Sequence, residues 1–424
     1  MGHIQAGLAE RLALAACALL GGTPAAAAED GDTQVGLAVL HWSEADRVTA
    51  VEPVIDLRQA VGSDAAVSVK LVLDSLSGAS HNGAAVQGYP QTFSSASGGG
   101  GGYTVAPGAV PLEPGFEDFR TAVSAGYETA LPDPLWKATV GASMSSETDF
   151  LSLAASATLA RDFNKRNTTV LGGLSLESDD IEPAGGAPVP FALRPVAVPG
   201  GGEDETEEEG EDGGGASGPA RSRRVVDAMI GITQVIDRAT LMQFNLALSQ
   251  ANGYMNDPYK VVTVETPVAG YVNENRPDNR TRYSLYWGGR HAFASENVLD
   301  AGYRWMRDDW GVVSHTLDVY YRIQMPGHWY VEPHLRGYRQ TAADFFTMSL
   351  APGNVPAEGT VNAYASGDYR LGALRDTTAG IRVGMRTDRN SEYYLRFERF
   401  SQRGDWEPAR LQATILELGA NWQF

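Results

Sequence analysis

The residues of this chain that could do chemistry are few, and their spacing argues against a catalytic or metal centre. Ser314 directly precedes His315, and hydrolases use a serine beside a histidine, but neighbouring residues of a strand point to opposite faces of a sheet. No two histidines are spaced as a metal-binding pair. We therefore expect no enzymatic activity, no metal and no cofactor. The histidines are His3, His41, His81, His291, His315, His328 and His334.

The densest charge is an acidic tract at 203–212, which holds eight acidic residues framed by glycine runs. This composition is typical of a solvated, disordered loop, because nothing in it can bury apolar area. The alternative is capture of a divalent cation, since hard cations prefer carboxylates, although the glycine-punctuated spacing of a Ca²⁺ loop is missing. A second glycine run, Gly98–Gly102, is typical of a flexible tether, because no Lys-Ser/Thr pair and no helix follows it.

Composition excludes several classes of protein. The formal net charge is −19, from 33 Lys and Arg against 52 Asp and Glu, whereas nucleic-acid binding needs a basic surface. The single cysteine excludes an intrachain disulfide, a Cys-ligated zinc site and c-type haem. Past the N-terminus no run of about 18 apolar residues occurs, which excludes a bundle of membrane-spanning helices.

Residues 1–28 have the pattern of a secretory signal peptide. Arg11 is followed by the apolar run 12–20 and then by the alanine tract 25–28, which resembles a signal-peptidase site. We expect cleavage near Ala28, which leaves residues 29–424 as a single domain. Two alternatives stay open: a buried N-terminal helix, and acylation of Cys17, because Leu14-Ala15-Ala16-Cys17 resembles a lipoprotein box.

The rest of the chain alternates between apolar and polar residues with a period of two, which predicts strands. In 313–323, for example, Leu317 and Val319 alternate with Asp318 and Tyr320. Such segments predict about 16 strands, within a range of about 14–16. Their expected spans are 33–43, 46–59, 65–75, 117–131, 135–146, 149–162, 166–177, 224–237, 239–252, 282–293, 297–307, 311–324, 328–341, 376–387, 391–402 and 411–424.

Long and short connections alternate between these strands. The long ones, which we expect to be flexible, are 76–116, 178–223, 253–281 and 342–375, and tight turns separate them. All long connections then fall at one end of a sheet. This segregation indicates a transmembrane antiparallel up-and-down β-barrel with short periplasmic turns and long extracellular loops. A soluble sandwich or propeller gives no reason for it.

The polar face of the expected strands is more charged than a dry core tolerates, because each buried unpaired ion costs several kcal/mol. A closed barrel satisfies every backbone group within a bilayer, and a hydrated lumen accommodates inward charges. The alternative is that the charges pair across the interior and plug it. The residues expected to line the lumen are Glu52, Asp56, Arg58, Lys70, Asp74, Asp300, Arg304, Asp318, Arg322, Glu332, His334, Arg336, Arg382, Arg386, Arg396 and Glu398.

The carboxyl terminus carries a further sign of a barrel. Trp422 and Phe424 continue the alternation of the last expected strand. A terminal Phe with an aromatic residue two positions earlier resembles the signal that the bacterial barrel-insertion machinery recognises. Combined with the export signal and the loop pattern, it places the protein in the bacterial outer membrane, with outer-membrane lipid and that machinery as expected partners.

Several segments together resemble one known family. They are 72–83, 90–93, 159–168, 226–227, 257–260, 275–282, 307–311, 333–336 and 338–340. The chain resembles the proteobacterial outer-membrane family of unknown function catalogued as domain-of-unknown-function family thirty-five seventy. The resemblance implies an outer-membrane barrel and brings no catalytic residues. Through the family's usual gene neighbours it also implies an exported periplasmic partner with a redox-related role.

Charged residues gather where two of these segments meet the expected loops. We interpret them as ion-paired clusters that hold extracellular loops over the barrel mouth, with Arg280 and Asp309 as the pair to test. The alternative is solvated charge at strand ends. The residues are Arg276, Asp278, Arg280, Arg282, Arg307, Asp308 and Asp309.

Taken together, these patterns predict an outer-membrane barrel that acts as a channel or transport component for small polar solutes. One alternative is a non-conducting barrel that scaffolds the exported partner. A less favoured one is an outer-membrane hydrolase. No nucleic-acid partner is expected.

Overall fold

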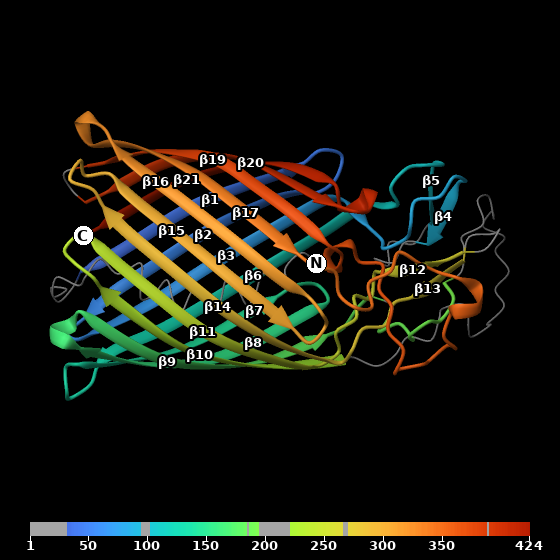
Figure 1. Cartoon of the computed structure of the whole chain (residues 1–424), viewed down its shortest axis with the longest axis horizontal. Coiled ribbons are helices and arrows are strands. Elements are labelled where there is room, and N and C mark those ends of the chain that lie inside the picture. The colour runs from blue at the N-terminus through green and yellow to red at the C-terminus, as the bar shows by residue number, and fades with distance from the viewer. Residues whose placement is uncertain (1–31, 95–101, 185, 195–220, 266–269, 388–389) are drawn as a thin grey trace.

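The computed structural model describes residues 32–94, 102–184, 186–194, 221–265, 270–387 and 390–424 (Figure 1). The predicted signal peptide, the acidic tract 203–212 and most of the glycine run Gly98–Gly102 lie outside these residues. No helix in the described part of the chain is long and apolar enough to cross a membrane.

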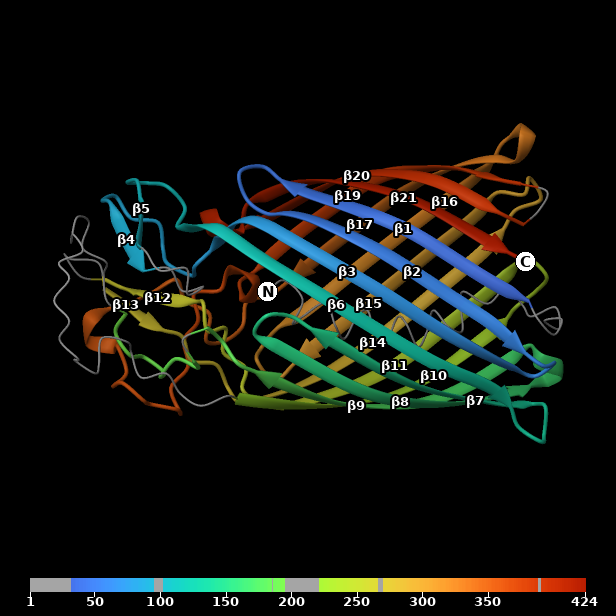
Figure 2. The same ribbon diagram turned by 180° about the vertical axis from the view of Figure 1, so that it is seen from behind.

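Sixteen strands of the described chain close into one antiparallel barrel, in which the first strand pairs with the last. Figure 2 shows them wrapping around a common axis with a uniform tilt. The prediction of an all-β barrel of about 16 strands is therefore confirmed. The barrel strands are β1 (Thr33–Glu44), β2 (Thr49–Val61), β3 (Ala65–His81), β6 (Leu112–Ala130), β7 (Trp136–Ser146), β8 (Phe150–Phe163), β9 (Thr168–Ile181), β10 (Arg221–Val235), β11 (Thr240–Gly253), β14 (Asn279–Ala292), β15 (Val298–Asp308), β16 (Val313–Gln324), β17 (Trp329–Gln340), β19 (Leu374–Arg386), β20 (Glu392–Gly404) and β21 (Leu411–Gln423).

The alternation in the sequence now has a spatial meaning. On β11 the apolar side chains Phe244, Leu246 and Leu248 lie exposed on the outer face, whereas the polar Gln243 and Ser249 are buried on the inner face. A soluble protein would bury the first set and expose the second. An apolar exterior around a polar interior is the arrangement of a barrel that spans a bilayer.

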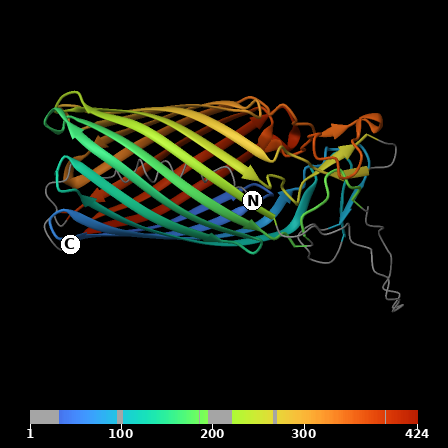
Figure 3. The same ribbon diagram turned by 90° about the horizontal axis from the view of Figure 1, so that it is seen from below.

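The connections segregate by length as predicted. The turns β2–β3, β6–β7, β8–β9, β10–β11, β14–β15, β16–β17 and β19–β20 all lie at one end, which we name the turn end. The long connections leave from the other end, the loop end (Figure 3). The barrel closes at the turn end through Thr33 and Phe424, whose backbones exchange two hydrogen bonds of 3.2 and 2.9 Å.

The long loops carry structure of their own, which the expectation of flexible loops did not anticipate. They contain the short strands β4 (Gln91–Ser94), β5 (Gly102–Val105), β12 (Val261–Val264), β13 (Gly270–Asn273) and β18 (Ser349–Leu350). β12 pairs antiparallel with β13 and parallel with β18, and β4 pairs with β5. We term the described loop residues between 82 and 111, 182 and 194, 254 and 278, and 341 and 373 the cap.

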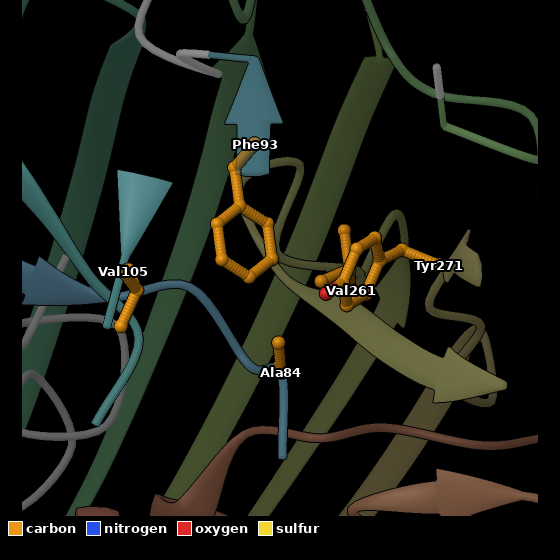
Figure 4. Close-up of a cluster of buried hydrophobic side chains, with 5 residues drawn as sticks. All are labelled: Ala84, Phe93, Val105, Val261 and Tyr271. Atoms are coloured by element: carbon orange, nitrogen blue, oxygen red, sulfur yellow. The ribbon is translucent and has the colours of Figure 1, made fainter. Parts of the chain in front are cut away.

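The cap has its own apolar core. Figure 4 shows Phe93, Val105 and Ala84 from the loop after β3 packing around Val261 and Tyr271 from the loop after β11. The Phe93 and Tyr271 rings lie 4.7 Å apart. Loops that leave the barrel at distant strands therefore fold together beyond its end.

Five short 3-10 helices complete the described chain. Two lie in turns at the turn end, two in the cap and one between β20 and β21. They are η1 (Asn164–Arg166), η2 (Pro326–His328), η3 (Pro352–Asn354), η4 (Tyr369–Leu371) and η5 (Glu407–Ala409).

Candidate functional site

The barrel interior is the first candidate site, because all the residues predicted to line the lumen lie on inward faces of strands. Their register partners across adjacent strands are themselves inward residues. Asp56 faces Lys70, for example, and Arg382 faces both Glu332 and Arg396. Because side chains alternate across a strand, one confirmed inward residue fixes the face of the others on that strand.

A histidine joins two carboxylates on the inner wall. His334 on β17 places its two ring nitrogens 2.7 Å from Asp318 Oδ1 and 2.7 Å from Glu398 Oε1. Donation from both nitrogens requires the protonated imidazolium. The ring also stacks on Tyr320, with centroids 4.1 Å apart and planes 2° from parallel. On β19, between β17 and β20, Gly380 leaves the space that the Glu398 side chain occupies.

Further along the wall, arginines lie over tyrosine rings that in turn cover glycines. Arg322 lies 4.2 Å from the Tyr330 ring and Arg382 lies 4.5 Å from the Tyr394 ring. A Cβ atom at Gly419 would collide with the Tyr394 ring. Each glycine leaves room for a tyrosine ring, and an arginine lies on the face of that ring. A side chain at the glycine would displace the ring, so these layers stiffen the wall.

The inward charges differ in exposure along the barrel axis. Near the turn end, the Arg290 side chain is 59% exposed, and Arg336, closer to the middle, is 49% exposed. At the loop end, the Arg280 side chain is 7% exposed and its partner Asp308 is fully buried. The inward arginines near the turn end and the middle are therefore far more exposed than the Arg280–Asp308 pair at the loop end.

An apolar cluster occupies the opposite side of the interior. Ala160, Leu171, Met229 and Ala247, from β8, β9, β10 and β11, pack together there. The charged wall thus spans one part of the circumference, and a drier wall spans another.

The predicted loop-base residues divide into three groups: a buried pair on the barrel strands, an arginine that pairs within the cap, and residues that form no ion pair with one another. Arg280 pairs with Asp308 and also lies 4.3 Å from the Trp310 ring. Arg276 lies 2.6 Å from Glu274 and 3.1 Å from Asp368 within the cap.

The remaining members of that set form no ion pair with one another. Asp309 accepts a hydrogen bond from the Thr281 backbone N–H at 2.9 Å, and Asp278 accepts one from Asn279. Arg282 is inward-facing on β14, in register with Asp308. Arg307 is exposed on the outer face of β15.

A buried charge cluster inside the cap was missed by the sequence analysis. Asp257 and Asp368 both contact Arg370, at 2.9 and 2.6 Å, and the backbone N–H of Asp257 donates to Glu274. Together with Arg276 these groups connect the loop after β11 to the loop after β17. Residue 257 lies in a family-like segment, but no spacing rule pairs it with a residue about a hundred positions away.

Burial and neighbouring charges shift the pKa values of two carboxyl groups in the cap cluster. Burial, supported by the nearby Asp257, raises the pKa of Glu274 to about 7 although Arg276 opposes the change. Burial alone would raise the pKa of Asp368, but Arg370 and Arg276 outweigh it and hold that pKa well below its usual range. The cluster thus mixes one carboxyl that titrates near neutrality with one that stays ionised.

The adjacent Ser314 and His315 do not converge. Ser314 is buried on the inner side of β16, whereas His315 is exposed on the outer side and lies 2.6 Å from the Tyr303 hydroxyl. Among the described residues, no group of three or more His, Cys, Asp or Glu is arranged to hold a metal ion.

The apolar exterior, closed strand order and charged interior define a membrane-spanning β-barrel. The chain belongs to the family described as "Protein of unknown function (DUF3570)", whose profile matches residues 9–422. No curated protein matches the sequence.

Among solved structures, the chain is similar to a ferric enterobactin receptor of Pseudomonas aeruginosa, with 11% identity, a TM-score of 0.42, and coverage of 88% of this chain and 54% of that one. It thus spans about half the length of that receptor. It is also similar to OccK2 of Pseudomonas aeruginosa in complex with glucuronate (10% identity, TM-score 0.38, 93% and 98% covered). A bacterial polysaccharide outer membrane secretin is a further similar structure (7% identity, TM-score 0.45, 92% and 98% covered).

Proposed function

We propose that the protein is an outer-membrane channel or transport component for small polar solutes. Solute would enter the charge-lined interior from the turn end, and the cap would control the loop end. The export signal expected at 1–28 and the terminal aromatic pair Trp422 and Phe424 support the outer-membrane location.

One observation carries this proposal: inward-facing charges remain exposed to solvent. The Arg336 side chain is 49% exposed although it points into the barrel. Its Nη1 atom lies 3.2 Å from Asp318 Oδ2. Among the described residues, no carboxylate forms an ion pair with the inward-facing Arg304, which lies 6.0 Å from the Tyr286 ring. A dry interior would make such a cation costly, whereas water or a polar solute stabilises it.

A second observation favours the scaffold alternative. At the loop end, Arg280 with Asp308 and Arg223 with Asp179 are buried pairs, and the cap folds beyond them. If this closure is permanent, the barrel conducts nothing and its cap serves as a platform for an exported partner.

Conductance separates the two functions. The refolded protein is inserted in a planar bilayer and compared with a variant whose cap cluster is broken, Asp368→Asn with Arg370→Gln. Stepwise openings in either protein support a channel, and openings in the variant alone show that the cap closes it. Silence in both, with the barrel shown to be inserted, refutes the channel and leaves the scaffold.

A matched control tests whether the interior is the conducting path. Arg336→Gln removes an inward charge, and Arg224→Gln removes an exposed charge from the outer face of β10. If solute passes through the lumen, only the first changes ion selectivity. Removal of residues 200–218, which contain the acidic tract, tests whether that segment filters ions before the mouth.

A further inference from the structure

The outer face of the barrel carries a row of arginines near the loop end. Arg339 on β17 is in register with Arg375 on β19, which is in register with Arg403 on β20. All three side chains are exposed. Arg399 lies on the same face of β20, four positions before Arg403, and is also exposed. We name these four residues the arginine patch.

This arrangement costs energy unless an anion is present. Side chains in register on adjacent antiparallel strands have Cβ atoms about 4.5–5.5 Å apart, and like charges at that spacing destabilise a sheet. No carboxylate of the described chain forms an ion pair with any member of the patch. Arg399 finds only neutral partners, the hydroxyl of Thr414 and the amide oxygen of Gln412.

The patch is not a general feature of the barrel rim. On the other side of the barrel, the exposed outward residues near the loop end include the acidic Glu117 on β6 and Asp180 on β9. Exposed outward arginines also occur near the loop end at Arg224 on β10 and Arg307 on β15, but neither has an arginine in register on an adjacent strand. The row of three arginines in register is therefore confined to β17, β19 and β20.

Below the patch the same three strands are apolar. Leu335, Ile381, Val383 and Phe397 are exposed on the outer face. Ten residues separate Arg375 from Met385, which is in register with Trp329 and Tyr393 near the turn end. At about 3.3 Å per residue and a tilt of about 40°, this span is about 25 Å along the barrel axis, the height of the apolar band of a membrane barrel.

Arg339, Arg375 and Arg403 therefore lie at the level where lipid headgroups begin, directly above a surface suited to acyl chains. We propose that the arginine patch binds the phosphate groups of a phosphorylated lipid in the outer leaflet, such as the lipid A part of lipopolysaccharide. Guanidinium groups bind phosphate oxygens in a bidentate manner, and several together hold one phosphate more firmly than a single lysine would. Leu335, Ile381 and Phe397 contact the acyl chains of the same lipid. The proposal rests on the outer-membrane location proposed above, but not on conduction.

The test compares three purified proteins in uncharged detergent. The patch variant carries Arg339→Gln, Arg375→Gln and Arg403→Gln. The control variant carries Lys165→Gln, Arg166→Gln and Arg238→Gln, which remove the same charge from exposed turns at the opposite end. The probes are bis-phosphorylated lipid A, dephosphorylated lipid A and inorganic phosphate, and native mass spectrometry measures bound lipid.

The wild type and the control variant are expected to bind bis-phosphorylated lipid A equally. The patch variant is expected to bind it on the order of 100-fold more weakly at low salt, from about one kcal/mol per arginine. Equal binding by the patch variant, or equal binding of dephosphorylated lipid A, overturns the proposal. Competition by millimolar inorganic phosphate also overturns it, because the patch would then be a site for a free anion.

Two further measurements keep these outcomes distinct. If the triple substitution prevents folding, the single variant Arg375→Gln is used, with about a fivefold loss expected. Single-channel behaviour is recorded for the same proteins. Silence of both the wild type and the cap variant refutes the proposed channel while the lipid measurements still stand. Loss of lipid binding with unchanged conductance separates the patch from the lumen.

Discussion

The pair Arg280 and Asp308 offers the sharpest test of the reasoning about the loop end. Arg280 Nε donates to Asp308 Oδ2 at 2.8 Å, and its guanidinium stacks on Trp310. Asp308 Oδ1 also accepts from the backbone N–H groups of Trp310 and Val312 at 3.1 and 2.8 Å. One carboxylate therefore closes the β15–β16 turn and neutralises a buried cation.

Removing either partner leaves the other buried charge uncompensated. Breaking a buried pair in this way costs about 3–5 kcal/mol. We expect Asp308→Ala to lie at the upper end, because it also removes the two turn hydrogen bonds. For Arg280→Ala we expect about 3 kcal/mol, since the two backbone donors still stabilise the remaining carboxylate.

The measurement is a double-mutant cycle on the free energy of unfolding, from urea titrations of the barrel refolded in lipid vesicles. We expect a coupling energy of at least about 1.5 kcal/mol between Arg280 and Asp308. The matched control is the next residue, Asp309, which forms no ion pair with Arg280 among the described residues and should couple by less than about 0.5 kcal/mol. A coupling as small for Asp308 as for Asp309 would refute the assignment of this pair as the closure of the loop end.

Two further predictions concern the wall and the cap. Gly419→Ala should destabilise the barrel by about 1–3 kcal/mol, because its methyl group displaces the Tyr394 ring. Gly337→Ala, with open space around it, should change the stability by less than about 0.5 kcal/mol. Thermal unfolding measures both variants, and equal effects would count against the layered wall. For the cap, the pKa of Glu274 is raised to about 7 from 4.5, so the folded cap holds a proton that the unfolded cap releases. The free energy of cap unfolding should therefore fall by about 3 kcal/mol as the pH rises from about 4.5 to above 7. Amide exchange of β12, corrected for its intrinsic pH dependence, should show this fall in the wild type and lose it in Glu274→Gln; an unchanged slope in the variant would exclude Glu274 as the titrating group.

The barrel could be predicted from the sequence because alternate residues of a membrane strand face the lipid and the interior. Apolar and polar residues therefore alternate along the sequence. Leu317 and Val319 already indicated that Asp318 points the other way, and closure of the sheet followed from the loop pattern. The same parity could have identified the partner of Arg280. Asp308 shares the inward face with Asp300 and Arg304, whereas Asp309 does not.

The cap could not be predicted in the same way. Its strands are four residues long or shorter, too short for a period to show. Its central strand β12 is completed by β18, which lies about 85 residues later in the chain, and only the closed barrel brings the two together. The arginine patch was missed for a related reason, because Arg339, Arg375 and Arg403 become neighbours only through strand pairing.

The cap is assembled from loops that leave the barrel at β3, β9, β11 and β17, so no single hairpin contains it. Its surface is consequently a composite epitope that exists only after most of the cylinder has closed. An antibody raised against that epitope would recognise the finished molecule and ignore nascent or stalled chains. Binding of such an antibody would therefore indicate that folding of the barrel is complete.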